Sequence, residues 1–187
     1  MATNSVTAIL EQIHRGDPSA SEQLLPLVYH QLRQAAAVQL SQEKPGQTLS
    51  PTALVHEAYV RLVDGSSSAV WDSRGHFYSA AAEAMRRILV ESARRRNSLK
   101  RGGTLVRQNI EELDIPLGQP PDEILAVHEA LEKLSQIDVR AAELVKLRYF
   151  AGFTMKEAAE ILAIAPRTAD DVWAYSRAWL AAEIGRQ

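Results

Sequence analysis

The chain has 187 residues, of which 46% are hydrophobic and 24% charged, a composition that suits one globular domain or two small ones. Cysteine is absent, which excludes disulfides, thiolate metal sites and a cysteine nucleophile. We expect a cytoplasmic protein, because the first residues lack a basic start followed by an apolar run, and no segment reaches the roughly 20 apolar residues of a spanning helix.

Helical spacing of apolar residues dominates the first half of the chain, and we find no convincing strand alternation. Two of the expected helices have the start signal of a capping residue followed by proline, Asp17 with Pro18 and Ser50 with Pro51. The expected helical segments are residues 5–14, 17–40, 50–65 and 75–96. The sequence therefore predicts an all-α fold.

Residues 97–121 interrupt this periodicity with repeated glycine and proline, which indicates a linker. The linker separates an expected helical domain of residues 1–96 from a second one of residues 122–187. In the second domain we expect helices at 122–134, 138–150, 154–162 and 166–183. The predicted architecture is two small helical domains joined by an extended connector.

The last two of these helices have the pattern of a helix-turn-helix. Thr154 and Glu157 predict a capping box at the start of the short helix, and Pro166 starts the longer one after a brief turn. An ordinary helical hairpin is the alternative. Ala163 stands where such turns often carry glycine, so we expect the turn to form without a residue at positive φ.

Positive charge is concentrated in the centre of the chain, although the net charge is −2. Residues 86–107 hold eight basic residues and one acid, Glu91. Such a segment can contact phosphates, because each neutralised phosphate releases counterions. The candidates are Arg86, Arg87, Arg94, Arg95 and Arg96. The alternative is a solvated surface, in which Glu91 pairs with Arg95 four residues later.

Three aromatic residues, Trp71, Phe77 and Tyr78, precede this basic segment. Aromatic rings beside basic residues suit single-stranded nucleic acid, in which unstacked bases stack on the rings. Phe77 also begins an apolar stripe, so a core position is its alternative. Trp71 is therefore the better candidate for a base contact.

Signals for an enzyme are weak. His56 and Glu57 start like a zinc-protease helix, but no second histidine follows four residues after the first. Neither a glycine-rich phosphate loop nor a Ser/His/Asp constellation can be argued from the sequence. We therefore expect no metal, no cofactor and no catalytic residue.

Taken in this order, the segments resemble a bacterial RNA polymerase sigma factor of the extracytoplasmic-function (ECF) group. The resemblance covers residues 5–100 and 122–183. The stretch ALVHEAYVRLV is similar to the region 2 helix that docks on the clamp helices of the polymerase largest subunit, with Ala53 and His56 in place of the usual Asp and Gln. The resemblance implies polymerase contacts from Leu54, Val55, Glu57, Ala58 and Arg61.

The stretch HFYSAAAEAMRRILVESARRR looks like the helix that opens and reads the promoter −10 element. Three of the usual residues differ, since Ala80, Arg87 and Glu91 replace a Trp, an Asn and an Asp. The resemblance, together with the stacking argument for Trp71 and Tyr78, implies DNA contacts from Trp71, Phe77, Tyr78, Arg86, Arg87, Arg94, Arg95 and Arg96.

The stretch from LVKLRYF to RAWL is similar to region 4, which binds the −35 element. It departs from the family at 169–171, where Ala-Asp-Asp replaces an apolar residue followed by at least one basic one. Acids in the first turns of a helix favour the positive end of its dipole, which offers a structural reason for Asp170 and Asp171. We expect weak, polymerase-dependent −35 recognition through Arg167, Thr168, Asp171 and Arg177.

The implied function is that of an alternative sigma factor, which directs core RNA polymerase to specific promoters and promotes −10 strand opening. The implied partners are core polymerase, through its clamp helices and flap, promoter DNA and, as a further candidate, an anti-sigma factor; we expect no membrane contact. A second interpretation is a sigma-like adapter or helix-turn-helix regulator whose region 4 binds mainly protein, which the acidic C-terminal part of the chain supports.

Overall fold

A computed structural model gives the fold of the chain. It describes residues 6, 8–12, 15, 17, 19–40, 49–63, 73–99 and 121–186. Within these residues the structure is all-helical and contains no strand, as the sequence predicts. The short helix expected over 5–14 is seen at residues 8–12, whereas Trp71 and most of the expected linker, residues 100–120, lie outside the described part.

The helices agree with the expected segments to within a few residues. They are α2 (Ala20–Leu40), α3 (Pro51–Val63), α4 (Arg74–Leu99), α5 (Pro121–Ile137), α6 (Val139–Val145), the π-helical turn η2 (Lys146–Phe150), α7 (Met155–Ile161) and α8 (Pro166–Ile184). The main differences are a later start of α2, after Asp17, and a longer α4 that takes in the first three residues of the expected linker.

Short-range capping explains where several helices begin. The Ser50 hydroxyl accepts a hydrogen bond from the Ala53 N–H at 3.1 Å, which confirms the predicted cap of α3. Both bonds of the predicted capping box at α7 are present, between Thr154 and Glu157. The Ser73 hydroxyl accepts from the His76 N–H at 3.0 Å and caps α4, a signal that the sequence analysis missed.

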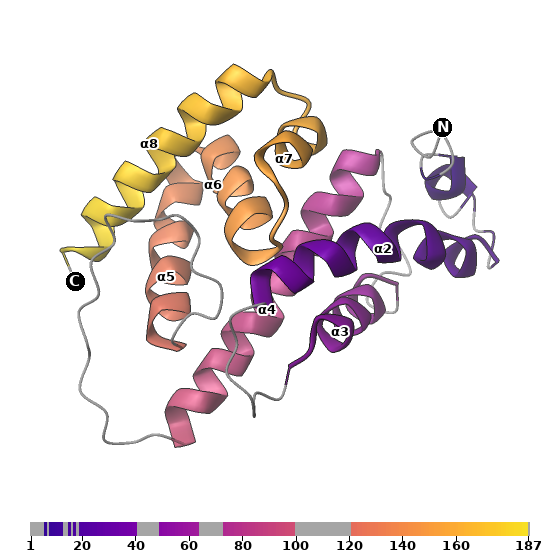
Figure 1. Cartoon of the computed structure of the whole chain (residues 1–187), viewed down its shortest axis with the longest axis horizontal. Coiled ribbons are helices and arrows are strands. Elements are labelled where there is room, and N and C mark those ends of the chain that lie inside the picture. Colours follow the sequence, from indigo (N-terminus) through magenta and orange to yellow (C-terminus); the bar gives the residue numbers. More distant parts are fainter. Residues whose placement is uncertain are drawn as a thin grey trace.

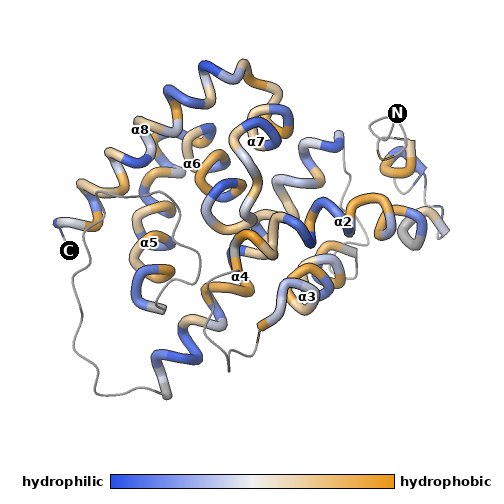
Figure 2. The backbone as a smooth tube through the Cα atoms, viewed as in Figure 1, coloured by the Kyte–Doolittle hydropathy of each residue, from blue (hydrophilic) through white to orange (hydrophobic). Residues whose placement is uncertain are grey.

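Helix α4 lies at the centre of the molecule (Figure 1). On one side it packs against α3, which in turn packs against α2; on the other side it packs against α5, η2 and α7. Figure 2 shows hydrophobic residues in the middle of α4 and a hydrophilic run at its C-terminal end. The centre of α4 is therefore core, whereas its end carries the polar side chains.

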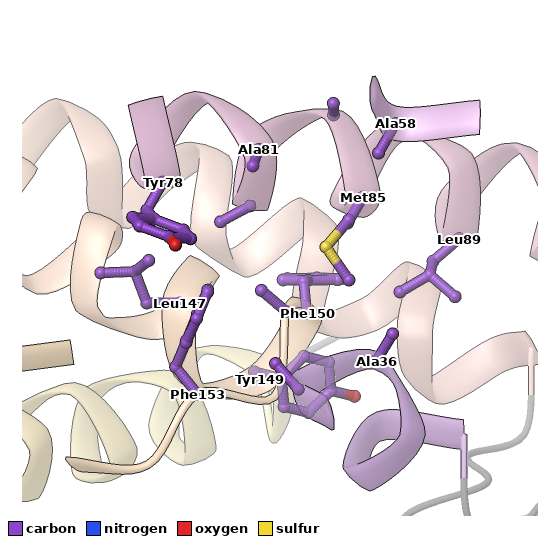
Figure 3. Close-up of a cluster of buried hydrophobic side chains, with 14 of the residues drawn as sticks. Ala36, Ala58, Tyr78, Ala81, Met85, Leu89, Leu147, Tyr149, Phe150 and Phe153 are labelled. Carbon is purple, nitrogen blue, oxygen red and sulfur yellow. The ribbon is translucent and has the colours of Figure 1, made fainter. Parts of the chain in front are cut away.

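One hydrophobic cluster joins the N-terminal helices to the C-terminal part, by which we mean residues 121–186. The apolar stripe predicted for α4 is buried, and its members are Phe77, Ala81, Ala84, Ile88 and Ser92. Figure 3 shows Tyr78, Met85 and Leu89 following α4 and facing side chains of the C-terminal part. Tyr78 meets Phe153 edge to face, with 5.6 Å between ring centroids. The two predicted domains thus share a packed boundary along α4.

The helix expected over 138–150 is not α-helical throughout. Asp138 caps α6 by accepting from the Ala141 N–H, but at Lys146 the backbone widens into η2, where the Ala151 N–H donates to the Lys146 carbonyl at 3.1 Å. The wider turn brings Leu147, Tyr149 and Phe150 into the core. Periodicity counted at 3.6 residues per turn does not reveal such an extra residue.

The turn between α7 and α8 corrects one expectation. Ala163 adopts φ 53°, so the turn does contain a residue in the left-handed region, and that residue is not glycine. The prediction of a turn without positive φ is wrong, because the Ile164 N–H donates to the Ala159 carbonyl and closes the helix end in the conformation that usually selects glycine. The short helix, turn and longer helix otherwise occur in the predicted order.

Candidate nucleic-acid interface

The arginines of α4 fall into two environments. Arg87, Arg94 and Arg95 are exposed and Arg96 is half-buried, so the C-terminal end of the helix presents a positive surface. Arg86 is only 7% exposed. The five arginines proposed as phosphate contacts therefore do not form one accessible face.

Arg86 is held by acids from two helices. Its guanidinium donates to both oxygens of Glu83, at 3.0 and 2.7 Å, within α4. It also donates to Glu132 Oε1 at 2.7 Å and contacts the His128 ring, both on α5. A buried guanidinium requires such partners, because an unpaired buried charge costs several kcal/mol, on the order of 3–5. Arg86 thus ties α4 to α5.

The protonation of this cluster follows from its contacts. Burial alone would raise the pKa of Glu83, but the hydrogen bond from Arg86 and the charges of Arg86 and Lys146 outweigh it and hold that pKa at about 2. Burial, and then the charge of Arg86, lower the pKa of His128. Near neutral pH the cluster therefore combines ionised Glu83 and Arg86 with a neutral His128.

Two of the three predicted aromatic contacts lie in the core. Phe77 and Tyr78 are buried, and their rings meet edge to face at 5.5 Å. The Arg74 guanidinium lies over the Tyr78 ring, 5.2 Å from its centroid. The core position given above as the alternative for Phe77 is the one that the structure has. In this arrangement neither ring is open to a nucleic-acid base.

The residues of α3 that are open to solvent differ from those that the resemblance implied as polymerase contacts. Leu54, Val55 and Ala58 are buried in the core. The exposed positions are Thr52 in the first turn and Ala53, His56 and Val60 further along, with Glu57 and Arg61 half-buried beside them. Sequence reasoning missed Ala53, His56 and Val60, although they lie opposite the apolar stripe of Leu54, Ala58 and Leu62, which could have indicated them.

Arg61 connects the α3 surface to α4. It donates to Glu57 within α3 at 2.7 Å and to both oxygens of Glu91 on α4, at 3.0 and 2.8 Å. These bonds, with the nearby arginines, lower the pKa of Glu91. Glu91 therefore has its hydrogen bonds with Arg61 of α3, whereas the alternative interpretation of the basic segment paired it with Arg95.

The solvent-facing side of α8 carries little positive charge. Thr168 and Arg177 are half-buried, and the exposed residues are Pro166, Arg167, Asp170, Asp171, Ala174, Tyr175, Ala178 and Ala182. The first turn of α8 holds no acid, since Asp170 and Asp171 come after it. The dipole explanation for the two acids is therefore weak, because that effect fades beyond the first turn.

The structure offers no alternative chemistry in the part that it describes. Among the described residues, no group of three or more His, Asp or Glu side chains is placed to hold a metal ion. None of the described helices is long and apolar enough to cross a bilayer. The site is thus an arrangement of charges on helices, with α4 basic at one end and α8 acidic.

The comparisons with known proteins agree with the resemblance drawn from the residues. A family model described as ECF sigma factor matches residues 3–186. No curated protein and no solved structure matches the chain. Since the match spans nearly the entire sequence, the chain belongs to the ECF sigma factor family, whose members are non-catalytic, DNA-binding factors of transcription initiation.

Proposed function

We propose that this sigma factor docks on core RNA polymerase through the exposed face of α3, formed by Ala53, His56 and Val60, and directs the enzyme to specific promoters. The exposed arginines at the end of α4 then contact promoter phosphates and assist opening of the −10 element. The observation that carries the proposal is the Arg61–Glu91 pair, which fixes the α3 face beside the basic end of α4. This role belongs in the cytoplasm, as expected from the sequence.

Promoter reading by α8 is the weaker half of this proposal. Its exposed side offers Arg167 to DNA, together with two acids that repel phosphates. We therefore propose that −35 recognition depends on the assembled holoenzyme, with Thr168, Asp171 and Arg177 as supporting contacts. The adapter interpretation keeps one specific support, since Asp170, Asp171 and Tyr175 together suit a basic protein surface better than DNA.

The test is transcription with purified core polymerase of the organism that encodes the chain. DNA fragments retained by the holoenzyme serve as run-off templates, and we expect transcripts that depend on the added factor. Core binding without a transcript from any retained fragment would favour the adapter.

A matched pair of variants tests the docking face. Val60 on α3 and Val38 on α2 are each 47% exposed. We expect Val60→Asp to weaken core binding at least tenfold and Val38→Asp to leave it within about twofold, because a charge in the centre of an apolar contact is desolvated without a partner. Equal effects of the two substitutions would contradict the assignment of the docking face to α3.

A further inference from the structure

Glu91 is the single acid within the basic segment of residues 86–107. It lies three residues before Arg94 and four before Arg95, so the three side chains are neighbours on one face of α4. A glutamate four residues before an arginine is the favourable order for an ion pair along a helix. Arg94 and Arg95 are nevertheless exposed, and among the described residues neither has an ion-pair partner.

Arg61 of α3 explains why these arginines are free, because it occupies both oxygens of Glu91. Its Nη1 and Nη2 atoms donate to Oε1 and Oε2 at 3.0 and 2.8 Å, the two-bond geometry that suits a guanidinium and a carboxylate. The hydrogen bond from Arg61 is the main cause of the lowered pKa of Glu91, and the charges of Arg95 and Arg94 add to it. Glu91 therefore lies within electrostatic reach of both arginines of α4 but bonds to α3.

The pair contributes little to the stability of the fold. The side chains of Arg61 and Glu91 are 34% and 48% exposed, and ion pairs so close to water are weak. Helices α3 and α4 pack on each other through the hydrophobic core, in which Ala58 and Met85 are both buried (Figure 3). The larger consequence of the pair is for the charge of the surface at the end of α4.

We propose that Arg61 is a positioning residue for DNA binding, which holds the Glu91 carboxylate and so leaves Arg94 and Arg95 free for promoter phosphates. The inference rests on the proposed function and deepens it. Without Arg61, Glu91 becomes an unpaired acid beside the two arginines, where it binds one of them and repels phosphate. This role differs from the polymerase contact that the resemblance implied for Arg61.

The test is a double-mutant cycle on the full-length chain, with Arg61→Ala, Glu91→Gln and the two combined. Binding to a mixed-sequence single-stranded DNA is measured over a series of salt concentrations, and core binding is measured by pull-down on the same proteins. We expect Arg61→Ala to weaken DNA binding about threefold and to reduce the salt slope by about 0.7, the value for one phosphate contact on a single strand. Core binding should stay within about twofold of wild type.

Glu91→Gln should behave differently in the two backgrounds. In the wild type it should change DNA binding little, because Arg61 already holds the charge of Glu91 and the amide oxygen still accepts a hydrogen bond. In the Arg61→Ala protein it should restore the wild-type affinity, because the acid that competes for Arg94 and Arg95 is gone. The non-additivity of the cycle measures the coupling.

Glu57 supplies the matched control. Arg61 also donates to its carboxylate at 2.7 Å, but Glu57 lies on α3. Glu57→Gln removes the same charge as Glu91→Gln, yet it should not restore DNA binding in the Arg61→Ala protein. Arg61→Lys keeps the positive charge but lacks the planar fork, so its affinity should fall between wild type and Arg61→Ala. It serves as the second variant if Arg61→Ala fails to fold.

Several outcomes would overturn the role of Arg61. A loss of DNA binding in Glu91→Gln as large as in Arg61→Ala would show that the pair only holds the helices together. An equal gain from Glu91→Gln in both backgrounds, or an equal rescue by Glu57→Gln, would show that only net charge matters. A loss of core binding in Arg61→Ala as large as in Val60→Asp would make Arg61 a polymerase contact.

Failure of the proposed function has a different signature. If Arg94→Ala with Arg95→Ala leaves single-strand binding unchanged, the end of α4 does not contact DNA, and the inference fails with the proposed function. If that double variant weakens binding while the Arg61 and Glu91 substitutions have additive effects, only the role of Arg61 is refuted.

Discussion

The two helices expected to contact DNA, α4 and α8, have opposite properties. Helix α4 carries the basic residues, but its centre is covered and Arg86 is bound by Glu83 and Glu132. Helix α8 is open to solvent along one side, but that side carries Asp170 and Asp171. The centre of α4 thus has positive charge without access, and the open side of α8 has access with little positive charge. A sequence motif for DNA binding indicates a residue type, whereas access to it is decided by packing with distant parts of the chain.

The largest expected effect comes from removing a side chain that covers α4. Phe153 is fully buried against Tyr78, so Phe153→Ala should lower the free energy of unfolding by about 3–5 kcal/mol. Tyr175→Ala on the open side of α8 should change it by less than about 0.5 kcal/mol. Urea denaturation followed by circular dichroism measures both. Similar losses in the free energy of unfolding for the two variants would show that the side of α4 facing Phe153 is no more tightly packed than the open side of α8.

The basic end of α4 should carry the DNA contacts. Changing Arg94, Arg95 and Arg96 together to Ala should weaken promoter opening about 100-fold and reduce the salt slope of single-strand binding by about 2. Permanganate footprinting measures opening, and a pull-down measures core binding, which should change little.

The control for this triple variant is Arg33, Arg140 and Arg186 changed to Ala, which alters the net charge equally at exposed positions outside α4. Two outcomes would contradict the assignment of DNA contacts to the basic end of α4. One is an equal loss of promoter opening and core binding in the α4 variant, and the other is a loss of opening in the control as large as in the α4 variant.

Burial of Glu83 beside Arg86 at the centre of α4 should make the stability of the fold fall in acid. The folded pKa of Glu83, about 2, lies below the ordinary value of 4.5, so ionised Glu83 stabilises the fold above pH 4.5, and this contribution is lost as the pH falls toward 2. The loss should be on the order of 2 kcal/mol. Glu83→Gln should abolish this part of the pH dependence in thermal unfolding, whereas exposed Glu129→Gln should keep it. A parallel pH profile for Glu83→Gln would contradict the assignment.

The acids of α8 permit a sharper test of its role. Asp170→Asn with Asp171→Asn should raise holoenzyme affinity for duplex promoter DNA about fivefold, because two like charges no longer face phosphates. Glu129→Gln on α5 should have no such effect. A decrease confined to one promoter sequence would instead indicate that Asp171 accepts a hydrogen bond from a cytosine. An unchanged affinity would place α8 away from DNA and favour the adapter.

The smallest effect concerns the turn that presents α8. Ala163 has φ 53°, a conformation that costs a non-glycine residue roughly 1–2 kcal/mol. Since glycine also gains freedom in the unfolded chain, Ala163→Gly should stabilise the fold by only about 0.5 kcal/mol. Ala174→Gly, within α8, should destabilise it by about 1 kcal/mol. Thermal unfolding should show opposite signs for the two variants.

Local chemistry made much of the fold predictable from the sequence. Ser50 and the Thr154–Glu157 pair predicted where α3 and α7 begin, because a cap and the N–H groups that it binds lie within three residues. Buried stripes such as Phe77, Ala81 and Ile88 follow from the 3.6-residue period. These features depend on neighbours along the chain, which a single sequence contains.

The packing of residues 121–186 on α4 depends on residues that lie far apart in the sequence, and the sequence analysis did not predict it. Glu132 lies 46 residues from Arg86 in the sequence, and no pattern within either helix indicates that they form a pair. One signal was nevertheless available, since a second apolar stripe of α4 is also buried, formed by Tyr78, Ala82, Met85 and Leu89. A helix with two apolar stripes requires two packing partners. The sequence thus contained evidence for a covered α4, although not for which helix covers it.

The π-helical turn η2 buffers the placement of the helix-turn-helix against a change in chain length. Loss of a single codon within Lys146–Phe150 would keep the reading frame and allow ordinary α-helical bonding. Each residue of an α-helix turns the chain by about 100°, but the wider π-turn takes up about one residue more per turn, so the direction of the chain after the deletion would change little. Phe153 and α7 would then stay against α4, while the side chains of the turn itself would change places in the core. An in-frame deletion there would therefore act on the stability of the core more than on the position of α8.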